Sequence, residues 1–191
     1  MITIVPYNPG WPDAFVEIAQ PMRTALGALA LRIDHIGSTS VPGLAAKDRI
    51  DIQITVQQLD CIPQMERALE PLGYILKPEN TSDHRPPLAQ GPETDWEKRF
   101  FRAAESQRPT NVHIRVAGRP NQRYPILFRD YLRLHPQASA AYAQIKVMLA
   151  QRQPDDLEFY YDIKDPVCDV IMGAAEEWAH LTDWQMGPAD R

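Results

Sequence analysis

One segment of the chain predicts two strands joined through a turn of very small side chains. Residues 35–47 read His-Ile-Gly-Ser-Thr-Ser-Val-Pro-Gly-Leu-Ala-Ala-Lys, and Ile-Asp-Ile-Gln-Ile-Thr-Val follows at residues 50–56. Every other residue of the second strand is aliphatic, so one face is apolar and the other carries the carboxylate of Asp51. We therefore expect a sheet with helices on the aliphatic face and Asp51 on the opposite face.

The turn at Gly37 and Ser38 favours a phosphorylated ligand. A Gly-Ser turn leaves backbone N–H groups and a hydroxyl uncovered, so phosphate oxygens can approach more closely than a bulkier side chain would allow. The turn leads into the strand of Asp51 after only a dozen residues. We expect the turn and Asp51 to face one cleft.

A second strand, at residues 111–116, has the same alternation. Its apolar residues face one way, whereas His113 and Arg115 face the other. If the two strands lie close together, Asp51, Gln53, His113 and Arg115 share the cleft with the turn. The alternative is that these polar residues line the solvated face of a half-covered sheet.

The rest of the chain predicts alternating helices and strands. We expect an edge strand at 2–6, a helix from Trp11 to about Gly27, a strand at 31–36, a helix ending at Gly73, a strand at 96–103, and helices at 126–134, 138–151 and from 165 onward. The last helix is expected to begin at Asp165-Pro166, because aspartate caps free N–H groups and proline suits the first helical position. Residues 77–95 hold four prolines and predict a mobile loop.

Length and charge narrow the class of protein. The 191 residues, 44% of them apolar, suit a single domain spanning 1–191. The net charge of −5 gives no strong nucleic-acid signal. Cys61 and Cys168 are expected to be reduced, and no run of about 18 apolar residues predicts a membrane span, so we expect a cytoplasmic protein.

The strand–turn–strand segment resembles the signature of the GrpB family, and similar blocks follow in the same order over nearly the whole chain. These blocks are residues 98–102, 111–115 and 128–136, with Tyr160 and Lys164. The sequence departs from the family pattern at Asp48, where proline is usual, and near Pro166. The resemblance implies an α/β, nucleotidyltransferase-like fold: a small mixed sheet flanked by helices, with a helical C-terminal segment.

The resemblance also implies roles around the sheet. In nucleotidyltransferases of this fold, three carboxylates hold two magnesium ions. Asp51 matches the first carboxylate, Gln53 stands in place of the second, and His113 is the best candidate for the third position. Asp51 is therefore the expected metal ligand for Mg²⁺ and a catalytic residue, with His113 as a base. The alternative for His113 is a hydrogen-bonded structural residue.

The expected ligand is a small phosphorylated molecule such as a nucleotide. Its candidate binding residues are those of the turn, the basic groups of the family blocks and one tyrosine, namely Gly37, Ser38, Thr39, Ser40, Lys47, Arg102, Arg115, Tyr160 and Lys164. Arginine is favoured because its planar fork fits phosphate with two bonds. The alternative for each basic group is a surface charge that serves solubility.

Two functions from different classes follow from this interpretation. One is an enzyme that transfers a nucleotidyl or phosphoryl group to a small acceptor. The other is a domain without catalysis that binds a nucleotide or a coenzyme-A-like phosphate ester, as a sensor or accessory module. The missing carboxylates favour the second. A contact role for the 77–95 loop in binding another protein is a third possibility that no residue requires.

Overall fold

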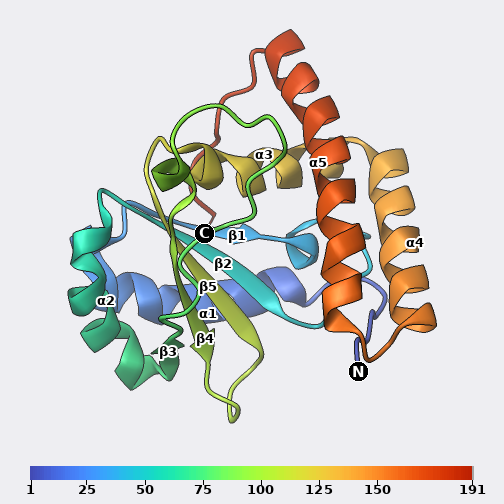
Figure 1. The fold of residues 1–191 in the computed structure, drawn as a ribbon. Coiled ribbons are helices and arrows are strands. Elements are labelled where there is room, and N and C mark those ends of the chain that lie inside the picture. The colour runs from blue at the N-terminus through green and yellow to red at the C-terminus, as the bar shows by residue number, and fades with distance from the viewer. Residues whose placement is uncertain (191) are drawn as a thin grey trace.

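The computed structural model describes residues 1–190 and contains one mixed five-stranded sheet (Figure 1). The strands lie in the order β1 (Arg32–Ile36), β2 (Ile50–Val56), β5 (Thr110–Val116), β4 (Arg99–Ala103) and β3 (Tyr74–Leu76). β2 and β5 are parallel, and the other three neighbouring pairs are antiparallel. The two strands with predicted polar faces are therefore direct neighbours.

One face of the sheet packs against α1 (Trp11–Leu26) and α2 (Ile62–Leu69), and α1 runs behind the strands in Figure 1. The alternating isoleucines of β2 contribute to this core together with Trp11, Met22 and Met65, all of them inaccessible to solvent. Each fully buried side chain of this size contributes about 1.5–3 kcal/mol. This burial directs the odd-numbered residues of β2 to the opposite face.

Three helices lie on that opposite side: α3 (Pro120–Leu134), α4 (Pro136–Arg152) and α5 (Leu157–Leu181). α4 and α5 stand side by side at one end of the sheet in Figure 1. A second apolar cluster connects these helices to the segment after the turn, and it includes Leu132 of α3, Tyr142 of α4 and Leu44 of that segment. These helices cover the polar face of the sheet only in part. Within residues 1–190 no helix has the length and apolar character needed to cross a membrane.

The architecture confirms the expected α/β class, with a mixed sheet flanked by helices and a helical C-terminal segment. Some elements differ from the prediction. Residues 2–6 form only an isolated bridge between Val5 and Ala46, α3 begins at Pro120, and the short strand β3 was not predicted. Three residues offer too little alternation for a sequence pattern to be recognised.

The predicted start of the last helix at Asp165 is wrong. The helix begins at Leu157, where the side chain of Asp156 accepts a hydrogen bond from the backbone N–H of Phe159 at 2.8 Å. Pro166 lies inside the helix, and Asp165 instead accepts a hydrogen bond from Lys164 Nζ at 2.7 Å. The Asp-Pro pair does not mark the start of the helix, because another aspartate, Asp156, caps it nine residues earlier.

The loop predicted at residues 77–95 has no strand and only a short 3-10 turn that begins at Glu93. Three backbone hydrogen bonds fasten it beside β4. Lys77 N–H donates to Phe100 O at 2.8 Å, and the other two, from Asp83 N–H to Trp96 O and from Lys98 N–H to Thr81 O, are both 2.9 Å long. The loop therefore runs along the polar side of the sheet, where Asp83 becomes important. Its mobility stays a prediction.

Candidate active site

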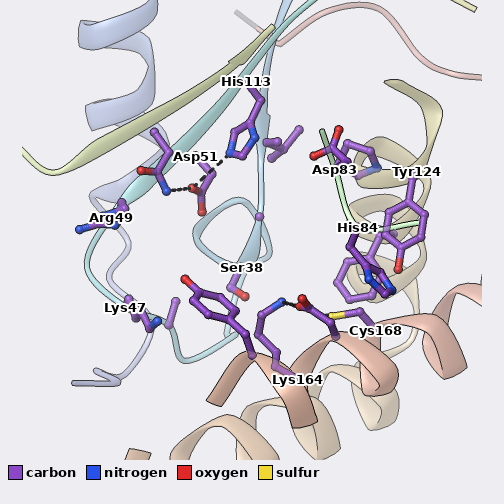
Figure 2. Close-up of a pocket in the computed structure, with 18 of the residues that line it drawn as sticks. Ser38, Lys47, Arg49, Asp51, Asp83, His84, His113, Tyr124, Lys164 and Cys168 are labelled. Atoms are coloured by element: carbon purple, nitrogen blue, oxygen red, sulfur yellow. Dashed lines mark hydrogen bonds and ion pairs between the residues drawn. The ribbon is translucent and has the colours of Figure 1, made fainter. Parts of the chain in front are cut away.

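A cleft of about 340 Å³ lies between the polar face of the sheet, the Gly37 turn and helices α3 to α5 (Figure 2). Nine predicted residues line it, namely Gly37, Ser38, Thr39, Lys47, Asp51, His113, Arg115, Tyr160 and Lys164. The structure thus brings together most of the residues that the sequence had singled out.

The side chain of Asp51 lies directly against the backbone of the turn. Gly37 has φ of +70°, and a Cβ atom added there would lie 2.6 Å from Asp51 Oδ2. Glycine is needed both for this backbone conformation and for the close approach. In the part of the chain that the structure describes, the N–H groups of Ser38 and Thr39 have no hydrogen-bond acceptor. They are free to bind an anion.

The other two hydroxyl residues hold the turn in shape. Thr39 Oγ1 lies 3.0 Å from His35 Nε2. Ser40 does not line the cleft, because its hydroxyl donates to the Gly37 carbonyl at 2.6 Å and supports the turn from behind. Ser40 therefore acts on a ligand only through the shape of the turn.

Helix α4 contributes a lysine that sequence reasoning missed. Lys146 Nζ donates to Ser38 Oγ at 2.7 Å and to the Ala45 carbonyl at 2.6 Å, and lies 4.5 Å from the centre of the Tyr142 ring. Burial lowers the pKa of Lys146 to about 7. One signal was available, since Lys146 follows Tyr142 by four residues and so shares its buried helix face.

Two further lysines surround the same region. Lys47 Nζ lies 4.1 Å from the centre of the Tyr160 ring and 4.9 Å from that of Tyr161. Burial, together with the nearby Arg49 charge, lowers the pKa of Lys47 to about 8. Burial opposes the charge of Lys164 as well, but Cys168 and Asp165 raise its pKa above the usual range. Figure 2 shows Lys47, Lys164 and Ser38 around one part of the cleft.

Asp51 stands on β2 opposite Asn111 of β5. Its Oδ1 accepts a hydrogen bond from Asn111 Nδ2 at 2.8 Å and lies 4.0 Å from His113 Nε2. Enclosure in the cleft raises the pKa of Asp51, although Asn111 partly offsets this by stabilising the carboxylate. Burial and the Arg115 charge lower the pKa of His113 well below its usual value, so its imidazole is neutral near pH 7.

The expectation that Gln53 opens into the cleft is wrong. Its side chain is inaccessible to solvent, accepts from Arg115 Nη1 at 2.7 Å and donates to the Gln122 carbonyl at 2.9 Å. Across residues 1–190, no three acidic, histidine or cysteine side chains are grouped so that they could hold a metal ion. Asp51 with the neutral Asn111 and His113 does not fit a pair of magnesium ions, which require several charged oxygen ligands.

The guanidinium of Arg115 faces a carboxylate from the 77–95 loop. Its Nε and Nη2 donate to the two oxygens of Asp83, each at 2.7 Å. Asp83 also accepts from Lys98 Nζ at 2.8 Å and from Asn121 Nδ2 at 3.0 Å. Although burial opposes ionisation, Arg115 lowers the pKa of Asp83 far below its usual value. No sequence pattern pointed to Asp83, because the loop has no periodicity.

The two arginines that were predicted to bind phosphate are therefore less available than expected. The bidentate edge of Arg115 is already paired with Asp83. Arg102 is exposed and lines a different hollow, beside Phe100 and residues 77–82, so the structure does not bring it to the cleft. A strand pattern places a side chain on a face, but it does not say how far along that face the ligand lies.

Comparisons with known proteins show which sequences this chain resembles. A family model described as GrpB protein matches residues 1–174. A Mycolicibacterium paratuberculosis protein named dephospho-CoA kinase is 38% identical over 96% of this chain and 48% of its own length. UPF0157 protein BH1888 of Halalkalibacterium halodurans is 33% identical over 91% of this chain and 82% of its own length. The chain spans about half the length of the first curated relatives that it matches.

Solved structures show the same fold. The conserved protein GrpB from Enterococcus faecalis superposes with a TM-score of 0.76 at 30% identity, over 92% of this chain and 99% of that one. A Cid1 poly(U) polymerase mutant bound to MgATP superposes with a TM-score of 0.50 at 13% identity, over 80% of this chain and 46% of that one. The second likeness concerns the fold alone, and it confirms the expected nucleotidyltransferase-like architecture.

Proposed function

This chain belongs to the GrpB family, and from that premise we propose that its cleft binds the phosphate groups of a nucleotide or of a coenzyme-A-like phosphate ester. The observation that supports the proposal is the contact of Lys146 Nζ with Ser38 Oγ at 2.7 Å. This contact places a cation against the turn whose backbone N–H groups are free. Anions are bound in proteins by this combination of fixed N–H dipoles and a nearby charge.

The charge in the cleft favours phosphate without a metal ion. Lys47, Lys146 and Lys164 all line the cleft. Of the three acidic groups that line it, Asp83 is paired with Arg115 and Asp165 with Lys164, and Asp51 lies against the turn. A lysine ammonium neutralises phosphate charge as a point charge with three donors. The lysines therefore supply what magnesium supplies in a two-metal site, as far as binding is concerned.

The relatives suggest which phosphate esters to test. Several curated relatives carry the name dephospho-CoA kinase, and the Cid1 structure contains MgATP. ATP, dephospho-CoA and coenzyme A are thus the first candidates. All three carry phosphate attached to an organic group, which is the ligand class that the turn and the lysines suit.

Isothermal titration calorimetry tests the proposal. Each ligand is titrated in buffer with EDTA and again with magnesium, and at least one is expected to bind in both. Lys146→Met should weaken binding roughly tenfold to a hundredfold, since it removes a charged hydrogen-bond donor. Lys77→Met is the matched control, because Lys77 does not line the cleft. Absence of heat with every ligand in both buffers, or equal losses in the two variants, contradicts the proposal.

Transfer of a nucleotidyl or phosphoryl group is a second candidate, favoured by the position of Asp51. Its Oδ2 lies 2.6 Å from the position that a Cβ atom on Gly37 would take, so the carboxylate would lie beside a phosphate bound at the turn. The raised pKa makes Asp51 a better proton acceptor for an attacking hydroxyl. Release of pyrophosphate or phosphate that disappears in Asp51→Asn would support transfer. Binding without any release in a broad acceptor screen would leave binding as the function.

A further inference from the structure

Three polar atoms in the wall of the cleft have no partner within residues 1–190: Trp96 Nε1, Asn111 Oδ1 and Asn121 Oδ1. Trp96 Nε1 and Asn121 Oδ1 are both buried and form no hydrogen bond with any residue that the structure describes. Trp96 is 5% exposed and Asn121 is 1% exposed, and both line the cleft. Buried polar groups in proteins are nearly always paired, so three unpaired groups in one cleft indicate that water or a ligand pairs with them. Asn111 lies at Asp51, to which its amide donates, whereas Trp96 and Asn121 come together at Glu97.

The orientation of the Asn121 amide is determined by its neighbours. Its Nδ2 donates to Asp83 Oδ2 and to the Glu97 carbonyl, both at 3.0 Å. Both of these atoms only accept hydrogen bonds, so the amide cannot be turned around without losing two bonds. Asn121 Oδ1 is therefore an acceptor, while Trp96 Nε1 can only donate.

Flat aromatic surfaces lie beside these two atoms. Tyr124 follows Asn121 by one helical turn on α3, and its ring lies 6.4 Å from that of Trp96. The rings of Tyr124 and Phe128 are stacked within 10° of parallel at 6.3 Å, and both residues line the cleft. Figure 2 shows Tyr124 next to His84, on the side of the cleft opposite Lys47. This part of the cleft suits a planar ring.

We propose that the Trp96 and Asn121 end of the cleft is a nucleobase subsite, in which Trp96 Nε1 donates to an acceptor on the base and Asn121 Oδ1 accepts from a donor on it. Every common nucleobase carries a donor beside an acceptor on the edge of a flat ring, whereas phosphosugars and inorganic polyphosphates have no flat ring to lie against the aromatic side chains. The ligand class is thereby narrowed to nucleoside phosphates, including esters that contain a nucleotide. This inference rests on the proposed function, because it assumes that phosphates occupy the lysine end.

Binding at this subsite involves a small rearrangement. Trp96 Nε1 and Asn121 Oδ1 are both closed to solvent, so a base reaches them only when the side chains that cover them shift. Trp96 ends the loop of residues 77–95, and the carbonyl of Glu97 next to it bonds to Asn121. A base that pairs with both residues would thus also order the end of this loop.

The decisive experiment separates the base from the phosphates. ATP, GTP, CTP, UTP and inorganic tripolyphosphate are each titrated by calorimetry against the full chain in EDTA. At least one nucleotide is expected to bind roughly tenfold more tightly than tripolyphosphate, from stacking and the edge contacts of its base. Trp96→Phe keeps a six-membered aromatic ring and removes the five-membered ring that carries the N–H donor. It breaks no hydrogen bond within the protein.

Trp96→Phe is expected to weaken the binding of that nucleotide roughly threefold to tenfold, which corresponds to one hydrogen bond, and to leave the affinity for tripolyphosphate unchanged. Trp178→Phe is the matched control, because Trp178 packs against Tyr131 and does not line the cleft. If tripolyphosphate binds as tightly as every nucleotide, or if Trp96→Phe weakens both ligands equally, the subsite is refuted while phosphate binding stands. If tripolyphosphate and all four nucleotides fail to bind, the subsite is refuted, and the proposed function fails as well when dephospho-CoA and coenzyme A also give no heat.

Discussion

Replacing Asp83 by asparagine removes the counter-charge of two buried cations. Arg115 and Lys98 have side chains 7% and 8% exposed, and among the described residues Asp83 is the carboxylate with which either forms an ion pair. Removing one partner of a buried ion pair costs about 3–5 kcal/mol, because the remaining charge is left without compensation. The asparagine keeps the shape of the side chain, so we expect a loss of about 3 kcal/mol in the free energy of unfolding.

Urea unfolding at pH 7, followed by tryptophan fluorescence and circular dichroism, measures this loss. Glu79→Gln is the matched control, since Glu79 is an exposed acidic residue of the same loop. Arg115→Met is combined with Asp83→Asn in a double-mutant cycle, where a coupling above about 1 kcal/mol is expected for charges in direct contact. An Asp83→Asn variant as stable as the control would refute the reasoning that this ion pair fastens the loop.

The same ion pair predicts how stability depends on pH. Arg115 lowers the pKa of Asp83 in the folded protein relative to its ordinary value of 3.8. The carboxylate therefore stabilises the fold above pH 3.8, and the contribution is lost as the pH falls below that value. The difference in unfolding free energy between wild type and Asp83→Asn should shrink in acid. A difference that stays constant down to the acid limit of folding would contradict the assignment.

Three further outcomes follow from the site and the helix boundary. Between about pH 6 and about pH 9, the tripolyphosphate affinity of the wild type should fall relative to that of Lys146→Arg. The reason is that Lys146, with a pKa of about 7, loses its charge over this range while arginine does not. Parallel pH profiles of the two proteins in calorimetry would argue against this. Gly37→Ala should lower the free energy of unfolding in urea by about 1–3 kcal/mol, because alanine is strained in this backbone conformation, and it should weaken ligand binding by displacing Asp51. A variant with unchanged stability and binding would disprove the close approach. Asp156→Ala should lower stability by about 1 kcal/mol through loss of the cap of α5, and no change would mean that the helix does not depend on it.

Several parts of the fold follow from the sequence because their signals are local. The alternation in residues 50–56 determined which side of β2 faces the helices, and the same alternation in β5 placed His113 and Arg115 on the side of Asp51. The small residues of the Gly37 turn likewise predicted a close backbone approach. Strand period and glycine conformation depend on neighbours in the chain, so the amino-acid order alone determines them.

The composition of the cleft depends on contacts that are distant in sequence. Lys146 meets Ser38 across 108 residues, and Asp83 meets Arg115 across 32 residues from a loop without periodicity. The unpaired donor of Trp96 is likewise invisible in the sequence, because an atom is unpaired only with respect to everything packed around it. The sequence by itself determined the turn, the strand faces and the family. The tertiary structure alone decided which charges meet there, since long-range packing has no local pattern.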